Sequence, residues 1–419
     1  MAERRFPVMS RLLSARRARR EPPPDQAHSA EARVPDTGAQ AFEPMGAINV
    51  DPTASSPAGT VKLRVVRPFG KDEHVEITAK SPGVPKLACI DGAAVREPST
   101  DLSDVIKVGG LAPSEVLARI RNWSLANGAA VTGWLSRARR HCGEEPRLLI
   151  HDETDANIPW ELLWLPDDPD RRQGAYVGCS FVTARWTPLQ VTRREQRNHP
   201  YSTLRCRGEV LAYVGEDMAE ADLSMIDGYG ARTVASARLL FKELADPGRP
   251  LSLVYIGAHG RFSTRSFEFT VAEVALGRIF AETFPRIDDA APLVFLNACH
   301  SGRVIIDESD TSLPSSFAEV FLRSGAAGFI GTTGAVRERE ARQVAKGILN
   351  ALARQPGKPV ATALRDFRRQ VVAEHSRQTW SADRGDEESR ALPLLYTFMY
   401  VYYGSLWTTV ELSGRGVGE

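Results

Sequence analysis

The chain has 419 residues, which is long enough for two or three domains or for one large domain with additions. Its residues are 42% hydrophobic and 25% charged, which is ordinary for a soluble globular protein. The formal net charge of +1 provides no whole-molecule attraction to nucleic acid or to an anionic membrane, so we expect neither as a partner. No apolar run approaches the roughly eighteen residues that a membrane-spanning helix needs.

The cysteines indicate a reducing compartment. They are odd in number, lie far apart and include no C-x-x-C pair: Cys89, Cys142, Cys179, Cys206 and Cys299. This distribution argues against a disulfide framework and against a structural zinc site. The sequence also lacks a G-x-x-x-x-G-K-S/T phosphate loop and ligand pairs at metal spacing. We therefore expect a cytoplasmic protein that needs no metal and no cofactor.

The first 59 residues differ in composition from the rest of the chain. Seven arginines fall within residues 1–20, and a Pro/Ala/Ser/Asp-rich stretch follows from Pro22 to Gly59. Such a segment buries too little apolar surface to offset the entropy of ordering, so we predict a disordered tail over residues 1–59. It lacks the apolar region of a secretory signal. Two alternatives are a basic tail that docks on nucleic acid or membrane, and a start codon placed too early.

The next segment, residues 60–110, is predicted to be β-rich. Apolar and polar residues alternate over 61–65 and again at Val75 and Ile77, with a Pro/Gly/Asp turn between them, as in a β-hairpin. Apolar residues then recur at helical spacing from Pro113 to about Arg140. A short strand is expected over 147–152, followed by a packed turn and short helix over 158–164.

From residue 210 onward the pattern alternates between strand and helix. Short strands are expected over 210–214, 252–256, 293–296 and 328–331, with a closing strand over 396–404. Helices are expected over 231–244, 316–324, 337–353 and 361–374. The continuous apolar runs of the inner strands are typical of parallel sheets that are buried on both faces. We therefore predict an α/β fold with a mostly parallel sheet flanked by helices, preceded by the β-hairpin and the tail.

Two of these strands run into chemically active side chains. The strand over 252–256 continues into His259-Gly260, and the strand over 293–296 continues into Cys299-His300-Ser301-Gly302. Because ligands collect beyond the carboxyl ends of parallel strands, His259 and Cys299 are expected to face one cleft. A nearby imidazole converts a thiol into a good nucleophile. The simpler alternative is that Cys299 is a small buried hydrophobe and His259 a satisfied core residue.

These motifs resemble the caspase-like cysteine peptidases and, within them, the CHAT family. Four further segments are similar to that family in the right order: the I-P-W-E-L-L run at 158–163, the helix and strand over 317–332, the helix start at 360–365, and the strand at 398–404. The resemblance assigns a CHAT peptidase domain to residues 111–412. It implies a caspase-like sheet, a protein substrate, and activity held latent until a protein or ligand reorders the loops around Cys299.

The resemblance also implies roles for particular residues. His259 would be the general base and Cys299 the nucleophile, with the backbone N–H groups of Gly260 and Cys299 forming the oxyanion hole. We expect Sγ of Cys299 and a ring nitrogen of His259 to lie roughly 3 to 6 Å apart. The function so implied is a caspase-like endopeptidase in a bacterial defence or cell-death pathway. The alternative is a catalytically silent CHAT scaffold, against which the retained His and Cys weigh.

Two positions bear on substrate specificity. Asn297 stands where basic-specific metacaspases have an aspartate that binds the substrate Lys or Arg, and Gly334 stands where the family usually has an aromatic residue. Both are assigned to substrate binding, and an uncharged residue before the cut is favoured. A pocket specific for aspartate would instead need converging arginines, for which the candidates near the motifs are Arg261, Arg303 and Arg337.

The other polar residues near the motifs receive structural interpretations. His300 could act as the base, but strand-end geometry favours His259. The loop after the cysteine is acidic and contains Asp307, Glu308 and Asp310. It could bind calcium or a basic partner, but the simpler interpretation is a loop exposed to solvent. Trp160, Glu161 and Trp164 are assigned to packing, and Arg365 to a structural ion pair.

Overall fold

The computed structural model describes residues 57–68, 73–81, 87–106, 110–166, 174–186, 201–306, 315–379 and 387–412. Residues 1–56 of the predicted tail lie outside the described residues. So do three members of the predicted acidic loop: Asp307, Glu308 and Asp310.

The described strands form one eleven-stranded sheet and three small sheets. The large sheet has the order β10 (Arg232–Val234), β9 (Glu209–Val214), β11 (Leu251–Gly257), β15 (Leu293–Asn297), β16 (Gly328–Thr332), β17 (Tyr400–Gly404), β7 (Val182–Trp186), β4 (Arg147–Asp152), β1 (Thr60–Val66), β2 (His74–Lys80), β3 (Ile90–Arg96). Neighbours are parallel except at β16–β17, β1–β2 and β2–β3. The predicted mostly parallel α/β sheet is confirmed.

The inner strands and the N-terminal hairpin of the sheet differ in how their faces are covered. Every residue of β11 and β15 is buried, which matches their continuous apolar runs and places them at the centre of the core. In β1 and β2 burial alternates along the strand, because only one face of the hairpin packs against the core. The hairpin is confirmed, and β1 also pairs in parallel with β4, so the segment extends the same sheet.

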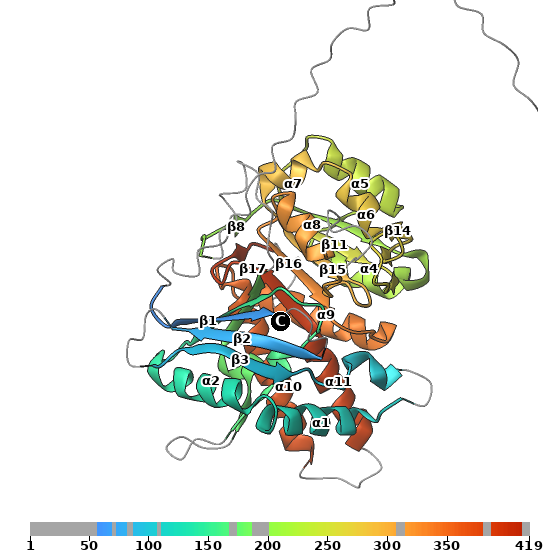
Figure 1. The fold of residues 1–419 in the computed structure, drawn as a ribbon. Helices are drawn as coiled ribbons and strands as arrows, with labels where there is room; N and C mark the ends of the chain where they lie inside the picture. Colours follow the sequence, from blue (N-terminus) through green and yellow to red (C-terminus); the bar gives the residue numbers. More distant parts are fainter. Residues whose placement is uncertain are drawn as a thin grey trace, which may run out of the picture. The chain divides into compact units, whose positions relative to one another are not determined.

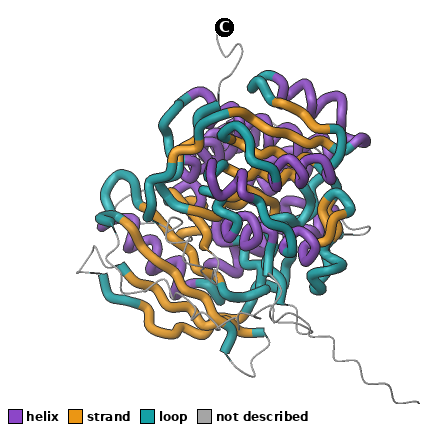
Figure 2. Tube along the Cα trace, turned by 90° about the horizontal axis from the view of Figure 1, so that it is seen from above, coloured by secondary structure: helices purple, strands orange, loops and turns teal. Residues whose placement is uncertain are grey.

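Helices pack beside these strands, as Figures 1 and 2 show. The α-helices are α1 (Pro113–Leu125), α2 (Ala129–His141), α3 (Val177–Ser180), α4 (Ala219–Asp227), α5 (Ala237–Ala245), α6 (Leu276–Phe280), α7 (Pro285–Ala290), α8 (Phe317–Arg323), α9 (Glu338–Arg354), α10 (Val360–Thr379) and α11 (Glu387–Met399). In Figure 1, α5, α6 and α8 gather at the β11–β15 part of the sheet, and α1, α2 and α10 at the β1–β3 part.

Shorter elements connect them and frame the candidate site. The 3₁₀ turns are η1 (Leu102–Ile106), η2 (Trp160–Leu162) and η4 (Glu216–Met218). The short strands are β5 (Trp164–Leu165), β6 (Ala175–Tyr176), β8 (Arg205–Cys206), β12 (Gly260–Arg261), β13 (Thr270–Val271), β14 (Val274–Ala275) and β18 (Thr409–Val410).

Three predicted elements differ from the structure. The helix expected over 231–244 begins only at Ala237, because Ser236 caps it by accepting the N–H of Leu239 at 3.2 Å, and the residues before it form edge strand β10. The strand expected from residue 396 begins at Tyr400, because the preceding residues form the last turn of α11. The helical region from Pro113 divides into α1 and α2 at residues 126–128.

Candidate active site

The candidate site lies where two central strands end side by side. β11 and β15 are parallel neighbours whose last paired residues are Gly257 and Asn297. His259 and Cys299 each follow two residues later. The N–H of Ala258 donates to the carbonyl of Asn297 at 3.3 Å, so the contact between these two segments continues past the ends of the strands. His259 is exposed and Cys299 is half-buried.

Gly260 brings the segment 258–262, which carries His259 and is called the histidine loop, directly against Cys299. A Cβ atom at position 260 would lie 2.2 Å from the carbonyl oxygen of Cys299 and 3.2 Å from its nitrogen. Such a distance to a backbone atom is too short for any side chain, so only glycine allows this approach. Among the residues that the structure describes, the N–H of Cys299 donates to no carbonyl. The two proposed oxyanion donors therefore belong to backbones in contact.

The thiol of Cys299 contacts the backbone N–H and carbonyl of Val336, which we call the thiol seat. Sγ lies 3.5 Å from the carbonyl oxygen of Val336 and 3.4 Å from its nitrogen. A thiol can donate to that carbonyl, and a thiolate can accept from that N–H, so the seat holds sulfur in both protonation states. Val336 follows β16 in the chain, and no local motif marked it as part of the site.

The turn after Cys299 is attached to the segment that carries Val336. The N–H groups of His300 and Gly302 donate to the carbonyls of Gly334 and Thr332 at 3.0 and 2.7 Å. His300 has a positive φ of 61°, an uncommon conformation for a residue other than glycine. Its ring centroid lies 5.3 Å from that of Phe262, so the side chain packs against the histidine loop.

Asn297 is part of a buried hydrogen-bond network. Its side chain is 2% exposed, donates to the Tyr255 hydroxyl at 3.0 Å and accepts from the Tyr400 hydroxyl at 2.6 Å. Burial raises the pKa of Tyr400 well above its usual range, which keeps that hydroxyl a donor. The structure thus turns the amide of Asn297 toward the core, and its assignment to substrate binding stays a prediction.

Gly334 lies within the wall of the site. A Cβ atom there would lie 3.0 Å from Sδ of Met399 and 3.3 Å from Oγ of Ser103, so the glycine permits close packing on both sides. Its role in substrate binding also stays a prediction. Of the three arginines near the motifs, Arg261 and Arg337 are exposed and Arg303 is buried in an ion pair with Asp101.

The polar residues assigned to structural roles are buried and paired. Glu161 is 1% exposed and forms a bidentate pair with Arg185, with distances of 3.0 and 2.5 Å. Burial alone would raise the pKa of Glu161, but the Arg185 guanidinium more than offsets it, so the pKa is lowered. Trp160 donates to Asp152 at 2.8 Å. The predicted ion pair of Arg365 is confirmed with Asp366 at 2.9 Å and Glu145 at 3.3 Å.

Replacing Glu161 by glutamine is expected to lower the free energy of unfolding by about 3 to 5 kcal/mol, because it leaves the Arg185 charge buried without its partner. Chemical denaturation at neutral pH measures the change. Since the pKa of Glu161 is lowered in the folded state, the stability that the Glu161–Arg185 pair contributes is present above the ordinary glutamate pKa. It is lost as the pH falls through the lowered pKa of the folded state. A loss below about 1 kcal/mol, the scale of an exposed pair, would contradict this.

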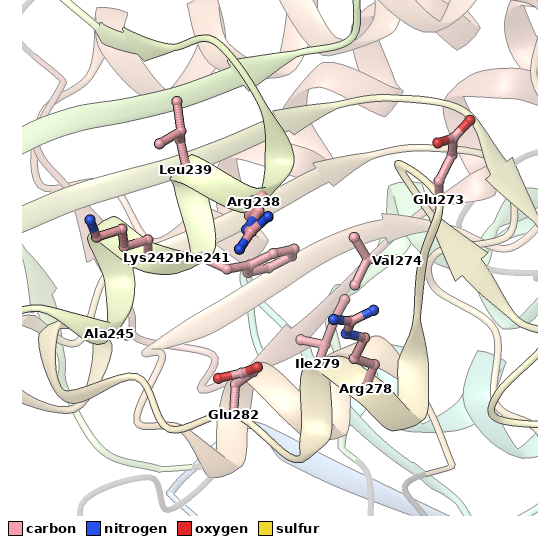
Figure 3. A pocket seen from close by; sticks show the side chains of 10 residues that line it. All are labelled: Arg238, Leu239, Phe241, Lys242, Ala245, Glu273, Val274, Arg278, Ile279 and Glu282. Carbon is pink, nitrogen blue, oxygen red and sulfur yellow. The ribbon is translucent and has the colours of Figure 1, made fainter.

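A cavity of about 850 Å³ lies beside the histidine loop (Figure 3). Its lining residues come from α5, the β13–β14 turn, the start of β14, α6 and the segment just after α6: Arg238, Leu239, Phe241, Lys242, Ala245, Glu273, Val274, Arg278, Ile279 and Glu282. The turn residues Ala272 and Glu273 have φ of 50° and 64°, as in a two-residue hairpin loop. The N–H of Ala272 donates to the carbonyl of His259 at 3.0 Å, so the turn joins the cavity to the site.

Within the described ranges, no helix is both long and apolar enough to cross a bilayer. The same residues contain no group of three or more His, Cys, Asp or Glu side chains that could hold a metal ion. The five cysteines are free, and Cys89 is the exposed one.

His259 and Cys299 thus follow adjacent parallel strands of a buried α/β sheet. A model of the CHAT domain family matches residues 148–394, a range that contains both residues. The chain belongs to the CHAT domain family.

Two solved structures are similar to the chain. One is the complex of the pro- and mature domains of Porphyromonas gingivalis RgpB, with a TM-score of 0.45 and 11% identity over 69% of this chain and 71% of that chain. The other is the Saccharomyces cerevisiae separase–securin complex, with a TM-score of 0.40 and 11% identity over 70% of this chain and 20% of that chain. No curated protein sequence matches the chain.

Proposed function

We propose that the protein is a cysteine endopeptidase in which Cys299 is the nucleophile and His259 the general base. The observation that carries the proposal is the contact between the two loops, where a Cβ atom at position 260 would lie 2.2 Å from the carbonyl oxygen of Cys299. This contact supports a site in which the imidazole and the thiol act on one substrate. The half-buried thiol and the exposed imidazole are both compatible with access for a polypeptide.

In the proposed reaction, His259 takes the thiol proton and the sulfur of Cys299 attacks the substrate carbonyl carbon. The carbonyl oxygen becomes an oxyanion, which the N–H groups of Gly260 and Cys299 stabilise. The imidazolium then returns its proton to the leaving amine as the peptide C–N bond breaks, which leaves a thioester. Water, deprotonated by His259, hydrolyses the thioester and restores the thiol.

The cellular setting that we propose rests on the family resemblance. The protein acts in the cytoplasm on a partner protein in a bacterial defence or cell-death pathway. It is latent until an activating protein or ligand reorders the loops around Cys299.

The residue before the cut is expected to be uncharged and apolar, such as leucine. A Lys or Arg side chain that enters a pocket loses hydration, which only a carboxylate inside can offset. Asn297 carries no charge and its amide is bonded to two tyrosine hydroxyls, and the carboxylate of Asp101 is already paired with Arg303. Profiling the purified, activated protein on a peptide library by mass spectrometry measures the preference. A strong preference for Arg or Lys would show that another carboxylate, such as Asp307 or Glu338, reaches the pocket.

A further inference from the structure

An ion pair between buried Arg303 and half-buried Asp101 joins the turn after Cys299 to the N-terminal part of the chain. Arg303 follows Cys299 by four residues and is 8% exposed. Its guanidinium pairs with Asp101, and its Nε donates to the carbonyl of Thr333 at 2.8 Å. The backbone of Arg303 is fixed as well, because its N–H donates to the carbonyl of His300 at 2.9 Å.

Through these contacts Arg303 touches both loops that frame the thiol. Thr333 belongs to the segment that ends in Val336, on whose backbone Sγ is seated. On the other side, the guanidinium lies 4.6 Å from the ring centroid of Phe262, which follows His259 by three residues. A shift of this guanidinium would therefore move the thiol seat and the histidine loop relative to one another.

Asp101 is held in place by its own neighbours. Its Oδ1 accepts the N–H of Ser103 at 2.8 Å, and Oγ of Ser103 accepts the N–H of Ala335 at 3.2 Å. The start of η1 is thus attached to the segment that carries Val336 at a second point, one residue from the thiol seat. Asp101 and Ser103 both lie outside residues 148–394, the range that matches the CHAT family.

We propose that Asp101 is a positioning residue of the peptidase site, which acts on Cys299 through Arg303. The inference rests on the proposed function. It means that the N-terminal β-rich segment supplies part of the framework of the site, and that a partner that displaces η1 would change the reactivity of the thiol.

The test measures the rate at which iodoacetamide alkylates Cys299 in the full-length Asp101→Asn variant, followed by mass spectrometry of the Cys299 peptide. We expect the rate to fall about tenfold, because the Val336 N–H no longer holds the sulfur in place for attack. Exposed Cys89 in the same molecule is the internal reference, and its rate is expected to be unchanged.

Two further variants separate positioning from stability. Arg96→Gln removes an exposed ion pair with Glu73 (2.8 Å) in the same N-terminal segment and is expected to leave Cys299 alkylation unchanged. The double variant Asp101→Asn/Arg303→Gln removes the unpaired buried charge. It is expected to recover melting temperature relative to Asp101→Asn while Cys299 alkylation stays slow.

Alkylation of Cys299 at the wild-type rate in Asp101→Asn would overturn the inference. Recovery of the rate in step with the melting temperature in the double variant would also overturn it, because the effect would then be one of stability alone. Alkylation requires no peptidase activity. A protein whose Cys299 reactivity depends on Asp101 but which cuts no peptide would contradict the proposed function and leave this inference standing.

Discussion

Replacing Cys299 by alanine is expected to reduce cleavage of the natural substrate by about 10³-fold or more, because no other group supplies the attacking sulfur. The fold should remain intact, since the change removes one half-buried sulfur atom, which contacts the backbone of Val336. Cleavage of the partner protein is followed on a gel, with thermal melting as the measure of folding.

Cys89→Ser is the matched control for that variant, because it removes an exposed thiol far along the chain from the site. It is expected to leave both cleavage and melting unchanged. Cleavage that survives in a well-folded Cys299→Ala protein would mean that another nucleophile acts. If the wild-type protein and the variant serve a cellular pathway equally well, the alternative of a silent CHAT scaffold is the better account.

Gly260→Ala is expected to reduce kcat/KM by about 10²-fold or more, the effect of losing one oxyanion-hole donor. The added Cβ would lie 2.2 Å from the carbonyl oxygen of Cys299, a backbone atom, so the histidine loop and the cysteine turn must separate. Steady-state kinetics on a cleaved peptide measure the loss, and circular dichroism checks the fold.

Gly133→Ala provides the comparison for that substitution. Gly133 lies inside α2, and the nearest atom to an added Cβ is Nη1 of Arg137 at 3.7 Å. Alanine there is expected to stabilise the helix by up to about 1 kcal/mol without affecting cleavage. Wild-type kinetics in Gly260→Ala would show that the loop contact has no part in catalysis.

Much of the centre of the fold could be predicted from the sequence because local signals there agree with the packing. The apolar runs that became β11 and β15 are long enough and uniform enough to indicate strands buried on both faces. The motif at each strand end then placed His259 and Cys299 at the same edge of the sheet. The hairpin of β1 and β2 was predictable for the same reason, since period-two alternation is a local pattern.

The framework of the site could not be predicted, because its contacts join residues far apart in the chain. Nothing around Val336 marks it as a partner of the thiol, and the pairing of Asp101 with Arg303 spans 202 residues. The hydrogen bonds of the Asn297 amide with two tyrosine hydroxyls in the core could not be predicted either, because Tyr255 and Tyr400 lie 42 and 103 residues away in the chain. The assignment of Asn297 to substrate binding stays a prediction.

The position of β17 has a consequence for biosynthesis. Among the described strands, the ladder from β10 to β16 is hydrogen-bonded to the ladder from β7 to β3 through β17, which pairs with β16 on one side and β7 on the other. β17 covers residues 400–404, near the end of the chain, so both parts of the sheet are translated before the strand that joins them. Asp101 comes from the β1–β3 side and Cys299 from the β11–β16 side. The two parts of the sheet, which supply Asp101 and Cys299, can therefore join across β17 only after residues 400–404 have been translated.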